Sequence, residues 1–98
     1  MKNWLRNKIK NLFSGVDFDI LIPPDEKMGD FSANIAFVLG KIEGKNPMAV
    51  GEEVLAKLKG DKELTNAFEK IEVVKPGFIN FYLNNKFLQQ KLGEITAD

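Results

Sequence analysis

The segment that most restricts the fold is residues 76–83, which read Pro-Gly-Phe-Ile-Asn-Phe-Tyr-Leu. Side chains alternate across a β-strand, so this segment would present two different faces. The wholly apolar face, which requires a core, consists of Ile79, Phe81 and Leu83. The mixed face consists of Phe78, Asn80 and Tyr82. Two aromatic rings and an amide suit a surface that stacks and hydrogen-bonds a nucleobase, although an ordinary half-buried strand has the same pattern.

A second strand is expected directly before this one. Residues 68–74 are rich in β-branched and aromatic side chains, and Pro76–Gly77 supplies a turn between the two segments. The two segments are therefore expected to pair as an antiparallel hairpin.

A further strand is expected over residues 16–22, where the apolar residues alternate in part. The side chains expected on its buried side are Phe18, Ile20 and Ile22. Pro23–Pro24 ends the segment, because proline has no N–H to donate to a strand ladder.

The remaining segments have the apolar spacing of helices. The first expected helix covers residues 4–13, and the second runs through Leu39 with Asp30 or Ser32 as its N-cap. A third helix is expected to start at Asn46–Pro47, followed by a short helical turn at 61–67. The last expected helix covers residues 84–98, with Phe87, Leu88 and Leu92 on one face. Gly40 and Gly44 are expected to break the second helix.

This element order predicts one α/β (α+β) domain over residues 1–98. Its expected architecture is a two-layer sandwich, in which a small, largely antiparallel sheet carries helices on one face. The apolar residues expected to meet between the layers are Ile71, Val73, Ile79, Phe81 and Leu83 from the sheet, with Leu5, Ile9, Val38, Val54 and Leu58 from the helices.

The composition excludes several classes of function. The chain has 98 residues with no cysteine and no histidine, so the usual nucleophiles, general bases and metal ligands are absent. We therefore expect no catalytic residue and no metal site. No apolar run approaches the roughly 20 residues that span a bilayer, and we expect no membrane partner and a cytoplasmic location.

The charge is balanced overall but uneven along the chain. Lysine and arginine together equal aspartate and glutamate, at 14 each, which argues against a protein that coats nucleic acid by charge alone. The residues before Asp17 include four basic side chains and no acid. A locally positive face is therefore compatible with a neutral domain.

Asn34 lies in an otherwise apolar stretch and should need a hydrogen-bond partner. An unpaired buried amide costs about 1–3 kcal/mol. Either the side chain bonds a helix end or a neighbouring loop, or it forms part of a docking surface for another domain.

Four blocks of sequence, in order, resemble one known family. They are Ile22-Pro23-Pro24, Gly29-Asp30-Phe31 through Asn34-Ile35-Ala36-Phe37, Asn46-Pro47 with Glu52 and Glu53, and Pro76-Gly77-Phe78-Ile79-Asn80-Phe81. Together they resemble the N-terminal additional domain of arginyl-tRNA synthetase, over nearly the whole chain. The resemblance implies a small α/β module that contacts the D-loop at the outer corner of tRNA.

The resemblance also implies site residues. An aromatic side chain and an amide on the last hairpin strand engage a D-loop base in that family, and the matching positions are Phe78 and Asn80. Lys75 is a further candidate for a phosphate or ribose contact. The residues expected to have interdomain or structural roles are Gly29, Asp30, Asn34 and Gly77.

The chain departs from whole synthetases of that family, because the catalytic domain is missing. The parent enzyme would be an arginine–tRNA ligase that uses ATP, whereas no cofactor is expected in this chain. The implied partners are tRNA and the enzyme's own catalytic domain, toward which the helix over 84–98 would lead, and no DNA. The alternative is a protein–protein or interdomain docking module, without RNA contact, that uses Asn34 and the last helix.

Overall fold

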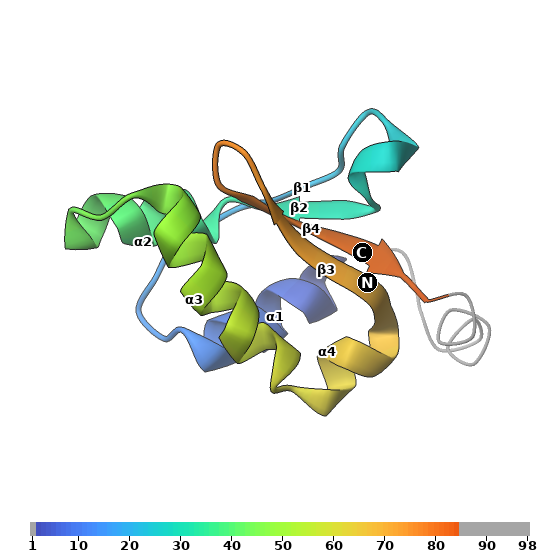
Figure 1. The fold of residues 1–98 in the computed structure, drawn as a ribbon. Helices are drawn as coiled ribbons and strands as arrows, with labels where there is room; N and C mark the ends of the chain where they lie inside the picture. The colour runs from blue at the N-terminus through green and yellow to red at the C-terminus, as the bar shows by residue number, and fades with distance from the viewer. Residues whose placement is uncertain (1, 85–98) are drawn as a thin grey trace.

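The computed structural model describes residues 2–84, whose fold is drawn in Figure 1. In chain order the elements are α1 (Lys2–Leu12), β1 (Ile20–Leu21), the 3₁₀ helix η1 (Glu26–Met28), β2 (Phe31–Ala33), α2 (Ile35–Glu43), α3 (Pro47–Lys59), α4 (Lys62–Ala67), β3 (Phe68–Val74) and β4 (Phe78–Leu83). The last predicted helix, with Phe87, Leu88 and Leu92, lies outside the described residues.

The four strands form one antiparallel sheet in the order β1-β2-β4-β3. The predicted hairpin is confirmed, because β3 pairs with β4 and Val74 lies opposite Phe78 at the turn. On its other side β4 pairs with β2, where Ser32 lies opposite Asn80. The strand that carries the sequence signal is thus a central strand of the sheet.

The helices α1, α3 and α4 lie on one side of the sheet, and the loop that contains η1 lies on the other (Figure 1). Ile79 and Phe81 point to the helical side and are 0% exposed. The predicted two-layer α+β architecture is therefore confirmed. The buried apolar core consists of Leu5, Ile9, Phe18, Ile20, Phe31, Ala33, Ile35, Ala36, Val50, Val54, Leu58, Leu64, Ala67, Phe68, Ile71, Ile79 and Phe81.

Three of the predicted core residues are only partly buried. Val38, Val73 and Leu83 pack against the core from its border. Val73 sits where α3 approaches β3, since a Cβ atom placed on Gly51 would be 2.9 Å from Val73 Cγ1. The predicted alternation thus gives the correct face of the sheet for Val73 and Leu83. How deeply each side chain is buried depends on the helices packed over the sheet.

The predicted strand over residues 16–22 is too long. Only Ile20–Leu21 pairs, and although Phe18 and Ile20 are buried as predicted, Ile22 is 69% exposed. Its partner β2 has only three residues, and Pro23 follows immediately. The ladder therefore ends one residue before Ile22.

The predicted helix start at Asp30 or Ser32 is wrong. Residues 31–33 form β2, and α2 begins at Ile35 with Asn34 in the N-cap position. Phe31 is drawn into the sheet, because it pairs with Phe81 and is 8% exposed. A three-residue strand between a loop and a helix has too little sequence to show an alternating pattern.

Gly40 lies within α2, so the prediction that it breaks the helix is also wrong. A Cβ atom there would be 2.9 Å from the carbonyl oxygen of Lys45, so glycine allows the following loop to pass close to the helix. Gly44 ends α2, as predicted, and it does so in the left-handed conformation.

The predicted start of α3 is confirmed. The Asn46 side chain accepts a hydrogen bond from the Met48 N–H at 2.8 Å, and Pro47 occupies the first turn. The predicted short helical turn at 61–67 is α4, which Asp61 caps by accepting from the Glu63 N–H at 2.9 Å. Both helix starts follow from side chains visible in the sequence.

Candidate nucleic-acid interface

The face of the sheet opposite the helices, here called the outer face, carries the predicted RNA-binding strand face. Its side chains from the central part of the sheet are Leu21, Ser32, Glu72, Phe78, Asn80 and Tyr82. The turn between β3 and β4 lies at one end of this face, and the loop over residues 22–30 lies at the other.

The turn at the first end depends on Gly77. Its N–H donates to the Val74 carbonyl oxygen at 2.8 Å, and its φ of 151° is one that glycine tolerates best. A Cβ atom on Gly77 would be 2.7 Å from the Cβ of Pro47. Glycine is therefore needed for the turn to sit against the start of α3.

Lys75 and Phe78 flank this turn. Lys75 is exposed and Phe78 is half-buried. The Phe78 ring packs against the Phe37 ring of α2 in a T-shaped arrangement, with centroids 4.9 Å apart and planes at 66°. The contact orients Phe78 at the border of the outer face. Phe37 was not predicted as part of the site, because its position beside Phe78 follows only from the tertiary packing.

We call this part of the molecule the hairpin end, defined by residues 44–48 and 74–78. It contains Lys45 and Lys75 and no acidic residue, although Glu43, which borders it, places its Oε1 3.9 Å from Lys45 Nζ. Because Pro47 lies against Gly77, the start of α3 is brought next to the turn. The hairpin end thus combines positive charge with an aromatic ring.

Asn80 does not lie on an accessible surface, although the sequence pattern placed it on a strand face that was expected to bind a nucleobase. It is on the predicted face but only 2% exposed. Ser32 on one neighbouring strand and Glu72 on the other lie directly opposite it, and Ser32 is itself 7% exposed. Strand alternation sets the face of a residue, whereas its exposure depends on what surrounds it there.

The side-chain oxygen Oδ1 of Asn80 has no hydrogen-bond partner. A buried acceptor without a partner costs about 1–3 kcal/mol. Such groups are rare in folded proteins and each requires an explanation. Here the unpaired acceptor belongs to β4, the strand predicted to bind a nucleobase, and Asn80 lies between Phe78 and Tyr82 on the outer face.

Tyr82 has a structural role on the outer face. Its hydroxyl lies 2.8 Å from Glu72 Oε1 and 2.9 Å from the carbonyl oxygen of Lys27, and a phenol has one proton to donate. The Lys70 ammonium lies over the ring, 5.1 Å from its centroid. The ring is therefore engaged on one side and is not the free stacking surface that the sequence pattern suggested.

These contacts shift two pKa values. The hydrogen bond from the Tyr82 hydroxyl lowers the pKa of Glu72, and the Lys70 ammonium, 3.2 Å from Glu72 Oε2, acts in the same direction against partial burial. The same hydrogen bond raises the pKa of Tyr82. Tyr82 and Glu72 thus stabilise each other's protonation states near neutral pH.

Gly29 and Asp30 fasten the loop over residues 22–30 to β4. Gly29 has a φ of 95°, and a Cβ atom there would be 2.8 Å from the carbonyl oxygen of Phe81. The Asp30 N–H donates to that same oxygen at 2.8 Å, and Asp30 Oδ2 accepts from the Leu83 N–H at 2.9 Å. Both residues therefore have a structural role within the domain.

Asn34 bonds a loop within the domain. Its Oδ1 accepts from the Asp19 N–H at 2.7 Å, and its own N–H donates to the Asp19 carbonyl oxygen at 3.2 Å. It makes no side-chain cap on α2. Of the two alternatives left open by the sequence, the helix-to-loop hydrogen bond is the one formed.

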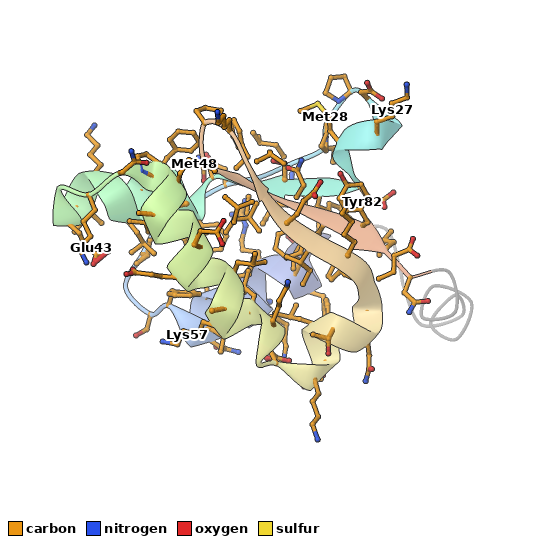
Figure 2. The ribbon with its side chains drawn as sticks, in the orientation of Figure 1. Lys27, Met28, Glu43, Met48, Lys57 and Tyr82 are labelled. Atoms are coloured by element: carbon orange, nitrogen blue, oxygen red, sulfur yellow. The ribbon has the colours of Figure 1, made fainter. Side chains whose placement is uncertain are left out.

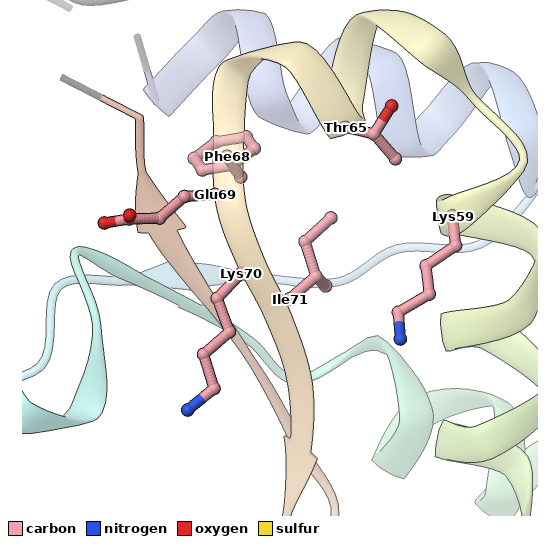
Figure 3. A pocket seen from close by; sticks show the side chains of 6 residues that line it. All are labelled: Lys59, Thr65, Phe68, Glu69, Lys70 and Ile71. Carbon is pink, nitrogen blue, oxygen red and sulfur yellow. The ribbon is translucent and has the colours of Figure 1, made fainter. Parts of the chain in front are cut away.

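A groove of about 430 Å³ lies beside β3 (Figure 3). It is lined by Lys59, Thr65, Phe68, Glu69, Lys70 and Ile71. The Thr65 hydroxyl is occupied as a donor to the Lys62 carbonyl oxygen at 3.1 Å. The groove offers no activated nucleophile, and within residues 2–84 no group of three or more potential ligands is placed to hold a metal ion.

The chain matches a family model described as the arginyl tRNA synthetase N terminal domain over residues 1–83. Domains of this family are found in arginyl-tRNA synthetases, which belong to the class of aminoacyl-tRNA synthetases. The chain belongs to the family of arginyl-tRNA synthetase N-terminal domains.

Individual relatives agree with the family. The arginine–tRNA ligase of Thermotoga petrophila is 38% identical over 92 residues, which are 89% of this chain and 16% of that protein. The arginine–tRNA ligase of Staphylococcus carnosus is 49% identical over 73 residues, 74% of this chain and 13% of that protein. The chain thus spans 16% or less of the length of these curated relatives.

A solved structure has the same fold. Thermus thermophilus arginyl-tRNA synthetase superimposes with a TM-score of 0.74 at 25% identity, covering 99% of this chain and 16% of that one.

Within residues 2–84, no helix combines the length and apolar character needed to cross a membrane.

Proposed function

We propose that this domain recognises the D-loop of tRNA as part of an arginine–tRNA ligase. The observation that carries the proposal is Phe78 at the hairpin end, half-buried and beside the exposed Lys75, in a chain of this family. An aromatic ring can stack a base, and the neighbouring ammonium can meet a phosphate.

The affinity of this contact is small. Stacking on an aromatic side chain is worth about 1–3 kcal/mol per base, and an exposed lysine adds a salt-dependent phosphate contact. A neutral domain with one such contact should bind tRNA weakly by itself. Its role would be to position a tRNA that the rest of the ligase also holds.

Asn80 would supply the hydrogen bond to the base. Its unpaired Oδ1 is an acceptor that a base N–H or amino group would satisfy. Because Asn80 is 2% exposed, neighbouring side chains must move before a base edge reaches it. We propose that binding of the base includes this local rearrangement.

The chemistry would lie outside this chain. The proposed parent enzyme uses ATP to attach arginine to tRNA in the cytoplasm, and its catalytic domain is the second proposed partner. This chain has no histidine or cysteine, so it would contribute binding alone. The alternative of docking through Asn34 loses support, because Asn34 bonds Asp19 within the domain.

Steady-state kinetics of a full-length ligase that carries this domain tests the proposal. We expect Phe78→Ala to raise KM for tRNA by about tenfold, with KM for arginine and ATP unchanged, because about 1.4 kcal/mol of stacking corresponds to a factor of ten. The matched control is Phe13→Ala, which removes another half-buried ring, one that contacts Lys57. Equal KM for tRNA in the wild type and Phe78→Ala would refute the proposal.

A further inference from the structure

Exposed apolar side chains, here called the apolar cluster, occur in the loop at the end of the outer face opposite the hairpin. The large apolar side chains exposed within residues 2–84 are Leu21 at 48%, Ile22 at 69%, Met28 at 45% and Ile42 at 69%. All but Ile42 lie within residues 21–30, which we call the loop end. Exposed apolar side chains that gather in one place mark contact surfaces.

The loop end is held in a defined shape. Leu21 pairs with Ser32, so the loop that follows starts and finishes at the same end of the paired strands β1 and β2. Met28 N–H donates to the Asp25 carbonyl oxygen at 2.9 Å, and the Tyr82 hydroxyl reaches the Lys27 carbonyl oxygen. Lys27 and Met28 lie on the turn above Tyr82 (Figure 2). The backbone around Lys27 and Met28 is therefore held in place over β4.

The charge of the loop end disfavours RNA as its partner. Residues 21–30 contain three acidic residues and one lysine, whereas the hairpin end contains two lysines and no acid. Phosphate groups would be repelled by the loop end and attracted by the hairpin end. An apolar protein surface bordered by basic residues is the complementary partner.

The path of the chain indicates which protein surface this is. Leu83, near the end of the described chain, donates its N–H to Asp30 Oδ2 at the end of the loop. The last described residues of β4 therefore lie beside the loop end. The relatives are ligases at least six times longer than their match to this chain, since the match covers 16% or less of each.

We propose that Leu21, Ile22 and Met28 form the surface on which the domain docks against the part of the ligase chain that follows it. This inference rests on the proposed function, in that it takes the domain to work within a ligase. It assigns the two ends of the outer face to two partners, the hairpin end to tRNA and the loop end to the ligase.

The test is thiol labelling of a full-length ligase that carries this domain, without tRNA. The variants are Ile22→Cys and, as a matched control, Ile42→Cys, because both isoleucines are 69% exposed in the domain. The N-ethylmaleimide labelling rate of each site is measured by mass spectrometry and divided by the rate of an unfolded peptide of the same sequence. We expect the Ile22→Cys site to react at least about tenfold more slowly than the Ile42→Cys site.

Equal labelling of the two sites would overturn the proposal. Protection that appears only when tRNA is added would assign the loop end to RNA, and protection that depends on enzyme concentration would assign it to a second copy. Either result contradicts docking within the ligase. Because the assay contains no tRNA, its outcome is independent of whether Phe78→Ala changes KM for tRNA.

Discussion

The hairpin end and the loop end lie at opposite ends of the same sheet, and they differ in charge and in the apolar side chains that they expose. The hairpin end offers Phe78 and exposed lysines, while the loop end offers exposed aliphatic side chains among acids. Between them lies the buried polar pair of Ser32 and Asn80. A small sheet can thus present two separate surfaces, because the segments that connect the strands at its two ends carry different side chains.

The two ends are also held differently. The turn at the hairpin end depends on a close approach to Pro47 in α3, whereas the loop end is fastened to β4 by one backbone hydrogen bond and one to the Asp30 side chain. When that attachment is broken, the loop end should lose its ordered structure while the hairpin end keeps its own.

The largest expected effect comes from Gly29→Ala, which breaks the attachment. The new Cβ atom would meet the Phe81 carbonyl oxygen at 2.8 Å at a positive φ, so we expect the free energy of unfolding to fall by about 2–4 kcal/mol. Gly15→Ala is the control, because its φ is also positive and nothing lies within 4 Å. Its loss should be about 1 kcal/mol. Urea denaturation measures both, and equal losses would show that the contact with Phe81 is unimportant.

Tyr82→Phe should have a smaller effect that depends on pH. Glu72 has a lowered pKa, so its bond to Tyr82 stabilises the fold above the unfolded carboxyl pKa, and this stabilisation is lost as the pH falls through the folded value. We expect a loss of about 1–2 kcal/mol at pH 7 that shrinks near pH 3. An equal loss at both pH values in urea denaturation would identify the Lys27 carbonyl oxygen as the main acceptor.

Asn80→Leu should separate stability from function. The substitution removes the unpaired Oδ1 and also the hydrogen bond between the Asn80 side chain and Tyr82, two effects that oppose each other, so we expect the free energy of unfolding to change by no more than about 1 kcal/mol. In a full-length ligase the same variant should raise KM for tRNA. A loss of stability well beyond this range, with KM unchanged, would show that Asn80 has only a structural role.

The smallest expected effect concerns the apolar cluster in the domain itself. Ile22→Ser and Ile42→Ser both alter exposed side chains, so each should change the free energy of unfolding of the 98-residue chain by no more than about 0.5 kcal/mol. A large loss for Ile22→Ser alone would mean that Ile22 supports the fold, which would remove the reason to regard it as a free surface.

The sequence was most informative where a pattern repeats over enough residues. Alternation in β4 placed Ile79 and Phe81 in the core, and the cap at Asn46 placed the start of α3. The strand β2 was missed because three residues give no period, and it forms through pairing with β4, which lies far along the chain.

The candidate site could be predicted only in part. Family resemblance and alternation pointed to Phe78 and Asn80, but the burial of Asn80 depends on the two strands that flank it. The contact of Phe78 with Phe37 and the engagement of Tyr82 by Glu72 join residues that are distant or on separate strands. Single-sequence patterns carry no information on such pairs.

The most direct test of the account is a two-dimensional NMR titration of the 98-residue chain with tRNA, because it reports each backbone amide separately and tolerates weak binding. We predict chemical-shift changes that centre on residues 44–48 and 74–78, with residues 21–30 unchanged. The changes should weaken with added salt, since lysine contacts to phosphate are screened. Changes centred on residues 21–30, or an unperturbed spectrum at saturating tRNA, would contradict it.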